Sequence, residues 1–277
     1  MGTPLGNRED LSPRARRSLL EADLLLCEDT RSPQRLLAPL GEGEVLPERI
    51  SCFVGNEHDR VALLLERLAA GQVVAFVSEA GLPVWSDPGR LLVRAAVDAG
   101  YEVDVIPGPS AGTCTLAISG FVAEGARFLG FLPRAGKERE AALAGLVNES
   151  GAVILYEAGN RVPALLRDLE SYVGERGIVI VRELSKLHQE VLRGRVRELA
   201  EAIREPLRGE VTVVIEGGLG ASVLDSTEAR RAGAREALEI LLDPTLKPRA
   251  RAKALGALTE RDVRELYERL RARTDEG

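Results

Sequence analysis

The sequence has few of the residues that build metal centres and disulfide frameworks. Its three cysteines, Cys27, Cys52 and Cys114, are widely spaced without a CxxC pair, and its two histidines are His58 and His188. An odd, scattered set of cysteines provides neither a disulfide framework nor a zinc ribbon. We therefore expect a reducing, cytoplasmic location. Two histidines can build neither an HExxH motif nor a three-histidine centre. Carboxylates could still bind Mg²⁺, but nothing in the sequence singles out such a site, so no metal ligand is assigned.

Aromatic residues and long apolar segments are also scarce. Aromatics make up 4% of the chain and there is one tryptophan, which argues against an extended stacking surface for single-stranded nucleic acid. No segment approaches the ~20 consecutive apolar residues of a membrane helix, and the first residues lack the basic and apolar regions of a signal peptide. We expect no membrane partner. The absence of GxGxxG and GxxxxGK[ST] motifs speaks against a Rossmann loop and a P-loop.

The residues that are present suffice for a globular core. The chain has 277 residues, of which 45% are hydrophobic and 29% charged, which excludes a disordered polyanion. This length suggests two domains of roughly 100–200 residues each. Residues 1–125 carry 11 arginines, no lysine and 18 acidic residues, whereas the remainder carries 26 basic and 25 acidic residues. An anionic substrate would thus be held mainly by the second half; a solvated surface of mixed charge is the alternative.

The first half of the chain alternates between predicted strands and helices. Apolar runs predict strands at 24–27, 72–77 and 101–106, and helices are predicted from Ser12-Pro13 to about residue 21, around 61–70 and at about 88–99. This alternation indicates a mostly parallel sheet. Ligands bind beyond the carboxyl ends of such strands, where three loops lie, at 28–31, 78–89 and 107–112.

The sequence of the second half predicts a mixed sheet followed by helices. Beyond a linker at 120–126, the pattern predicts helices near 138–147, 161–172 and 196–204 and strands at 128–132, 152–156, 178–181, 190–192 and 211–215. Strands outnumber the intervening helices, which favours a mixed sheet. The fold class is therefore α/β with three parts. They are an N-terminal α/β domain (1–120), a second α/β domain (126–220) and a helical, arginine-rich C-terminal extension (226–277).

One segment matches a catalytic pattern. Residues 108–112 satisfy G-x-S-x-G, which would make Ser110 a nucleophile with Asp168 and His188 as partners. Pro109 argues against this serine hydrolase, because it removes a backbone donor and fixes φ beside the nucleophile. The same loops could bind a small zwitterionic cofactor through their backbone and the acceptors Glu79 and Asp87. They could equally be ordinary turns.

Several segments nevertheless follow one another in the order and spacing of a single family. They are TPLGN (3–7), CEDTR (27–31), VSEAGLP (77–83), SDPG (86–89), PGPSA (107–111) and FLGFLP (128–133), continued by YE (156–157), RELSK (182–186), RGE (208–210) and EG (216–217). The chain resembles the tetrapyrrole-methylase superfamily. Within it, the chain resembles the branch that methylates the ribose 2′-hydroxyl of a cytidine in small-subunit ribosomal RNA. The resemblance spans roughly residues 3–218 and is looser in the helical tail.

The resemblance implies a two-domain fold, a homodimer, the RNA of the small ribosomal subunit as substrate and S-adenosylmethionine (AdoMet) as cofactor between the two domains. The cofactor-binding residues that it implies are Pro4, Ser78, Glu79, Gly81, Leu82, Asp87, Ser110, Ala111, Tyr156 and Gly217. Candidates for catalysis or RNA contact are Glu28, Asp29, Arg31, Arg182, Glu183 and Lys186.

The role of each candidate stays open at this point. A lysine would need a lowered pKa to act as a base, and Arg182 with Glu183 fits an ordinary ion pair equally well. The charge distribution suggests phosphate contacts at Arg134, Lys137, Arg139 and around 249–253.

The chain departs from the family pattern at three places. Glu79 stands where aspartate is typical, and Asn160 stands where a histidine is usual, so a role that depends on a titrating histidine does not carry over. The resemblance also begins at Thr3, without the family's first strand. A start codon assigned too far downstream or a shortened chain would produce this pattern. If the short form is authentic, weak cofactor binding is expected.

Three other functions remain as alternatives. Within the superfamily, the chain could methylate a corrin or porphyrin ring. The other two alternatives are the serine hydrolase and an assembly factor that binds AdoMet but does not catalyse methyl transfer.

Overall fold

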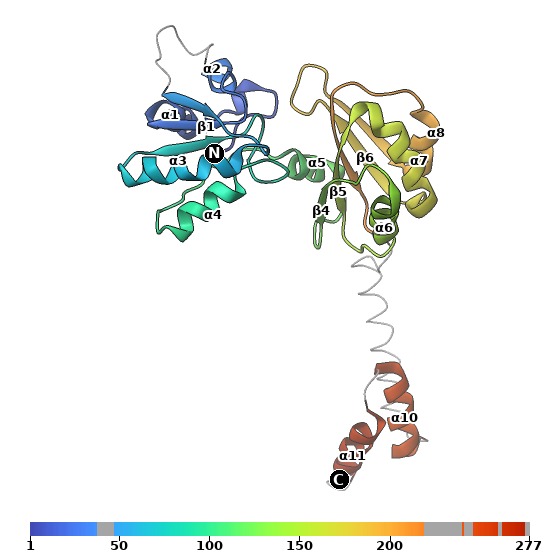
Figure 1. The fold of residues 1–277 in the computed structure, drawn as a ribbon. Coiled ribbons are helices and arrows are strands. Elements are labelled where there is room, and N and C mark those ends of the chain that lie inside the picture. The colour runs from blue at the N-terminus through green and yellow to red at the C-terminus, as the bar shows by residue number, and fades with distance from the viewer. Residues whose placement is uncertain (38–46, 219–239, 241–245, 260–261, 275–277) are drawn as a thin grey trace. The chain divides into compact units, whose positions relative to one another are not determined.

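The computed structural model describes residues 1–37, 47–218, 240, 246–259 and 262–274 (Figure 1). The chain forms two compact units, residues 1–218 and 219–277. The first unit contains a three-stranded sheet with the order β2-β1-β3 and a five-stranded sheet with the order β4-β5-β8-β6-β7. All strands of the first sheet are parallel, and the second sheet is mixed. The predicted pair of sheets is confirmed, whereas the boundary between domains at 120–126 stays a prediction.

The first sheet has helices on both faces (Figure 1). Leu25 and Cys27 of the central strand pack with Leu19 of α1, and Leu24 and Leu26 pack on the other face with α3 and α4. A strand buried on both faces needs a continuous apolar run, which is why its sequence predicts it so clearly. The elements are η1 Arg8–Asp10, α1 Pro13–Glu21, β1 Leu24–Cys27, α2 Ser32–Leu37, β2 Glu48–Ser51, α3 Glu57–Ala69, β3 Val74–Val77 and α4 Arg90–Asp98.

The sequence predicts α1 at its correct start. The Oγ atom of Ser12 accepts a hydrogen bond from Ala15 N at 3.0 Å, and Pro13 occupies the first helical position. An N-cap serine satisfies an otherwise unpaired backbone donor of the first turn, and proline has no such donor to lose. These two residues therefore fix where the helix begins.

The sequence does not predict one strand of this sheet and predicts another that is absent. β2 was not predicted because its sequence, Glu-Arg-Ile-Ser, has no apolar run, and it is held as an edge strand by its ladder with β1. The predicted strand at 101–106 is absent. Gly2 N donates to Ile106 O at 2.9 Å, and among the described residues no ladder joins 102–105 to a neighbouring strand. A segment without a paired neighbour is not a strand, whatever its composition.

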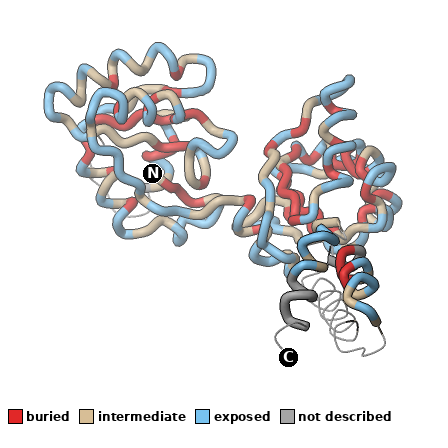
Figure 2. The backbone as a smooth tube through the Cα atoms, turned by 90° about the horizontal axis from the view of Figure 1, so that it is seen from below, coloured by how far each residue is buried: buried red, intermediate tan, exposed pale blue. Residues whose placement is uncertain are grey.

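The second sheet is also covered on both faces. Helices α6, α7 and α8 bury a large core on one face, and on the other face Leu116 of α5 packs with Ile154 and Val214. Figure 2 shows buried segments in the interior and exposed segments on the periphery. The elements are α5 Ala111–Ser119, β4 Arg127–Phe131, α6 Gly136–Leu146, β5 Val153–Ala158, η3 Gly159–Arg161, α7 Val162–Val173, β6 Gly177–Arg182, β7 Glu190–Arg195, α8 Val196–Ala202 and β8 Glu210–Ile215.

In the described residues of the second unit, the helices α10 Pro248–Thr259 and α11 Val263–Thr274 contact each other. They confirm the helical character predicted for this part of the chain, and the predicted start of the extension at 226 lies outside the described residues. Among the helices described here, none has both the length and the apolar character needed to cross a membrane.

Candidate active site

A cavity of about 400 Å³ lies where β1 and β3 end, and residues of the second sheet complete its wall. All three loops predicted to hold a ligand contribute to it. We call it the acidic cavity. Its lining residues are Leu5, Glu28, Glu79, Ala80, Gly81, Leu82, Trp85, Ser86, Asp87, Ser110, Ala111, Phe131, Tyr156, Glu157, Ala158, Val181, Leu184, Lys186, Gly209, Glu210, Val211 and Thr212.

Carboxylates dominate the charge of this cavity. Glu28, Glu79, Asp87, Glu157 and Glu210 line it, with Lys186 as the single cation of the lining. Burial, followed by repulsion from Glu28, Glu210 and Glu79, raises the pKa of Asp87 from 3.8 to about 6. Crowded carboxylates of this kind repel anions and stabilise a bound cation.

Lys186 is fixed between two carboxylates. Its Nζ atom donates to Oε2 of Glu210 at 2.8 Å and to Oε1 of Glu183 at 3.1 Å. Burial lowers the pKa of Lys186, but hydrogen bonds to Glu210 and Glu183 outweigh it, so the pKa is raised above 10.5. The pKa of Glu183 is lowered, first by the hydrogen bond from Glu210 N. Lys186 is therefore an ammonium ion at neutral pH, and it cannot act as a general base there.

The loop after β3 is held by a tight set of backbone contacts. Ser78 is buried and its Oγ atom donates to Gly81 O at 3.0 Å, while Thr3 and Gly81 exchange two backbone hydrogen bonds. Gly81 has φ +78°, a conformation that side chains disfavour. Val84 and Ser86 also have positive φ values, which is costly for a β-branched residue. Strained backbone of this kind concentrates at binding sites.

One wall of the cavity is aromatic. Trp85 lies against Phe128 with ring centroids 4.3 Å apart, and Tyr156 contacts Phe128 at 5.0 Å and Phe131 at 5.8 Å. The Tyr156 hydroxyl accepts a hydrogen bond from Gly112 N at 3.2 Å. Burial raises the pKa of Tyr156 above 10, so the phenol stays neutral. The wall offers flat apolar surface beside the carboxylates.

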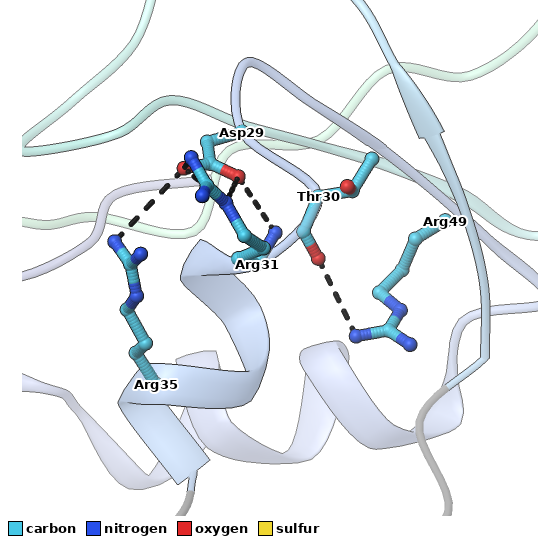
Figure 3. A network of polar contacts seen from close by, with 5 residues as sticks. All are labelled: Asp29, Thr30, Arg31, Arg35 and Arg49. Carbon is cyan, nitrogen blue, oxygen red and sulfur yellow. Dashed lines mark hydrogen bonds and ion pairs between the residues drawn. The ribbon is translucent and has the colours of Figure 1, made fainter.

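The loop after β1 holds a compact ion network (Figure 3). Asp29 accepts hydrogen bonds from Arg31 N at 2.8 Å and Arg31 Nε at 2.9 Å, and Arg35 lies 3.9 Å away. These bonds hold the pKa of Asp29 at about 2. The Nη1 atom of Arg49 donates to Thr30 O at 3.4 Å. This network shapes the turn and satisfies Asp29 with its own neighbours.

The structure brings most of the predicted site residues to the cavity. Those that line it are Glu28, Glu79, Gly81, Leu82, Asp87, Ser110, Ala111, Tyr156 and Lys186. Pro4 and Ser78 are buried beside the loop that they support, and Glu183 reaches the cavity through Lys186.

Asp29, Arg31 and Gly217 do not line the cavity. The first two bind each other, as described above. Gly217 follows the end of β8, beyond Ile215, whereas the lining residue Thr212 lies near its start. A Cβ atom at Gly217 would meet Ser150 O at 2.0 Å. Because two backbone segments approach so closely, a residue with a side chain would clash at this position, which explains the glycine structurally.

Sequence reasoning missed several lining residues. Phe131 pairs with Tyr156 across β4 and β5, and Thr212 pairs with Tyr156 across β8. Their place in the wall follows from the strand register, which the sequence does not reveal. Glu157 and Glu210 lie in the segments YE and RGE that carry the resemblance, so these segments were a signal that could have identified them.

The geometry does not support the hypothesis of a serine hydrolase with Ser110 as nucleophile. Asp168 forms an ion pair with Arg139, Nη2 to Oδ2 at 2.7 Å. No hydrogen bond joins Ser110 to His188 in the described part of the chain, and His188 is exposed. The same described residues contain no group of three histidine, cysteine or carboxylate side chains suited to a metal ion.

Comparisons with known proteins agree with this architecture. The model of the family "Tetrapyrrole (Corrin/Porphyrin) Methylases" matches residues 1–200. A Thermotoga maritima protein named Ribosomal RNA small subunit methyltransferase I is 43% identical over 196 residues, covering 71% of this chain and 86% of the relative. A Xylella fastidiosa protein of the same name is 36% identical over 271 residues, covering 96% of each chain.

Solved structures share the fold at lower identity. The methyltransferase CobJ superposes with a TM-score of 0.56 at 20% identity, covering 78% of this chain and 92% of that structure. Uroporphyrin-III C-methyltransferase from Thermus thermophilus, solved with S-adenosyl homocysteine, gives 0.52 at 20% identity, covering 76% of this chain and 93% of that structure. The matched family model and the two paired sheets lead to one conclusion: the chain belongs to the tetrapyrrole (corrin/porphyrin) methylase family.

Proposed function

We propose that this protein transfers the methyl group of AdoMet to the 2′-hydroxyl of a cytidine ribose in small-subunit ribosomal RNA. The relatives at 36–43% identity are named for methylation of that RNA. The observation that carries the proposal in the structure is the acidic cavity at the ends of the parallel strands. Its charge suits a cationic methyl donor, and its position is where ligands of parallel sheets bind.

The residues present fit AdoMet. The cofactor carries a sulfonium, an ammonium and a carboxylate group, so its net charge is positive, and Glu28, Glu79 and Glu210 provide carboxylates for its two cationic groups. Trp85 and Tyr156 offer an aromatic surface for the adenine ring. The Gly81 turn lets the backbone approach the ligand closely.

When bound, AdoMet supplies a methyl group that its sulfonium already makes electrophilic. The chain then has to align the ribose hydroxyl and accept its proton. Asp87 is the proton acceptor that we propose, because it lines the cavity and its pKa of about 6 is the closest to neutrality among the carboxylates with shifted values. A nearby positive charge would lower that pKa and keep Asp87 ionised. Lys186 stays protonated and orients Glu183 and Glu210.

A direct assay tests the proposal. Purified protein would be incubated with small ribosomal subunits that lack the modification and with AdoMet labelled in its methyl group. We expect labelled 2′-O-methylcytidine in nuclease digests, and its absence under conditions where the protein binds AdoMet would contradict the proposal. A labelled corrin or porphyrin product would instead favour the alternative within the family. The three-domain division, the homodimer and the cytoplasmic location accompany this proposal as predictions.

A further inference from the structure

A second hollow adjoins the acidic cavity. It has a volume of about 480 Å³ and is lined by Phe131, Arg134, Glu157, Ala158, Asn160 and Arg161. We call it the cationic hollow. Phe131, Glu157 and Ala158 line both spaces, so the two are neighbours. The cationic hollow lies at the carboxyl ends of the parallel strands β4 and β5.

The charge of this hollow is opposite to that of its neighbour. Arg134 is exposed, and among the described residues no carboxylate lies within ion-pair distance of it. The Nε atom of Arg161 lies 3.5 Å from Oε1 of Glu157, whose side chain is 3% exposed. One arginine is thus unengaged and the other covers a buried carboxylate. Two guanidinium groups against one carboxylate leave the hollow positively charged.

An exposed aromatic ring borders the same hollow. Phe131 is 59% exposed, although it follows three strand residues that are more buried. A large ring left in solvent beside two arginines matches the chemistry of single-stranded nucleic acid, whose bases stack on aromatic rings and whose phosphates bind guanidinium groups.

We propose that the cationic hollow binds the nucleotide next to the methylated ribose, with Arg134 and Arg161 on the phosphodiester and Phe131 stacked on the adjoining base. This inference rests on the proposed function and adds the position of the RNA. A ribose 2′-hydroxyl lies beside the carbon that carries the 3′-phosphate. A hydroxyl placed in the acidic cavity therefore brings a phosphate to its rim. The carboxylates of that cavity repel the phosphate, whereas the neighbouring arginines attract it.

The substitution Arg134→Ala tests the inference with little risk to folding, because Arg134 is exposed. Arg167→Ala is the matched control, since Arg167 is an exposed arginine of α7 that lines neither space. Both changes remove one positive charge. Arg134→Lys keeps the charge without the bidentate geometry. The measurements are AdoMet affinity by calorimetry, binding of in-vitro-transcribed small-subunit RNA at several salt concentrations, and methylation kinetics with unmodified small subunits.

For Arg134→Ala we expect unchanged AdoMet affinity, a roughly tenfold higher KM for the subunits with an unchanged kcat, and weaker RNA binding. The slope of log affinity against log salt should become shallower by about 0.7, the contribution of one contact to single-stranded RNA. Arg134→Lys should keep the slope but lose part of the affinity. Arg167→Ala should resemble the unchanged protein. Equal KM values and slopes for Arg134→Ala and Arg167→Ala would overturn the inference.

If the proposed function is wrong, these measurements give a different set of results. If the unchanged protein binds RNA but does not methylate it, the proposed activity fails, and the effect of Arg134→Ala on the salt slope still decides whether the hollow binds phosphate. If the unchanged protein shows no salt-dependent RNA binding, the inference about the hollow is wrong. Phe131→Ala adds a second readout, because loss of one stacked base should weaken RNA binding by about tenfold.

Discussion

The Nζ atom of Lys186 lies 2.8 Å from Oε2 of Glu210 and 3.1 Å from Oε1 of Glu183. Because these bonds keep the pKa of Lys186 raised, its role is electrostatic, and arginine should replace it. We expect Lys186→Arg to keep methylation within about tenfold, and Lys186→Gln to lose more, since it leaves two carboxylates unpaired. Complete inactivity of Lys186→Arg with normal folding and AdoMet binding would instead indicate that Lys186 carries the proton.

The pKa of Asp87 predicts how the rate depends on pH. With a pKa of about 6 in the protein without AdoMet, kcat/KM for AdoMet should fall tenfold per pH unit below about pH 6, because only the ionised carboxylate accepts a proton. Asp87→Asn should lower kcat by roughly 10²–10⁴-fold. The measurement is a pH–rate profile with unmodified small subunits between pH 5 and 9.

Two neighbouring substitutions serve as controls for that profile. Glu28→Gln removes a charge that raises the pKa of Asp87, so the acid limb should move to lower pH. Asp29→Asn should leave the limb in place, because Asp29 is paired with Arg31 and is not among the carboxylates that raise the pKa of Asp87. An acid limb that is unchanged in Glu28→Gln, or one that moves in Asp29→Asn, would contradict the assignment.

The same shift predicts that Asp87 lowers the stability of the fold at neutral pH. Its pKa is raised from 3.8 to about 6 on folding, so the folded state binds the proton more tightly, and stability falls as the pH rises from about 4 to about 6. Asp87→Asn should therefore increase the free energy of unfolding at pH 7. A shift of about two units corresponds to roughly 3 kcal/mol, which solvent contact of this half-buried side chain reduces to about 1–2 kcal/mol.

Urea unfolding at several pH values checks this prediction. The increase in the free energy of unfolding caused by Asp87→Asn should be complete above pH 6. It should disappear below about pH 4, where Asp87 is protonated in both the folded and the unfolded state of the original protein. A gain that is the same at pH 4 and pH 7 would show that the effect does not arise from this carboxyl group.

The strength of each fold prediction follows the physics of the element concerned. The four residues of β1 are all buried, so their apolar run identifies them. The residues of β2 are exposed or half-buried at the sheet edge, and their sequence carries no such signal. The segment 101–106 has the composition of a strand, yet its conformation depends on a neighbour with which to pair, and local sequence cannot show that.

In the candidate site, too, some features could be predicted from the sequence and others could not. Glu28, Asp87 and Ser110 follow predicted strands or open a predicted helix, so their place at one edge of a parallel sheet could be predicted. The partners of Asp29 and Lys186 could not, because an ion pair depends on side-chain geometry. The place of Phe131 in the wall follows only from the register of β4 with β5, whereas the charge distribution of the sequence already suggests Arg134 as a phosphate contact. The order of the motifs thus predicts where the cavity lies, whereas the role of each side chain depends on packing that the sequence does not reveal.

The backbone at Gly81 gives a test of the loop that lines the cavity. Gly81 has φ +78°, and a Cβ atom there would lie 3.0 Å from Leu5 Cδ2 and 3.1 Å from Pro109 O. Gly71 has φ +76° with open space around it. Gly71→Ala should therefore cost only the backbone strain, about 1 kcal/mol. Gly81→Ala should cost about 1 kcal/mol more and weaken AdoMet binding, measured by urea unfolding and calorimetry. Equal costs for the two variants would contradict this account of the loop.

Arg139 has a structural role, in contrast to Arg134, which we propose to bind RNA. The sequence suggests it as a phosphate contact, but its side chain is 10% exposed, and it donates to Asp168 Oδ2 at 2.8 Å and to Pro133 O at 2.9 Å. Arg139→Met should lower the free energy of unfolding by roughly 2–3 kcal/mol, less than for a fully buried pair because Asp168 is 40% exposed. Lys137→Met, at an exposed position of the same helix, should change stability little.

RNA binding then distinguishes the two arginines that the sequence placed together. At a temperature where Arg139→Met is fully folded, its RNA affinity and salt slope should equal those of the unchanged protein, whereas Arg134→Ala should lower both. The double change Arg139→Met with Asp168→Leu should recover part of the lost stability, because no unpaired charge remains. A salt slope that falls in Arg139→Met as it does in Arg134→Ala would mean that Arg139 leaves Asp168 to bind RNA.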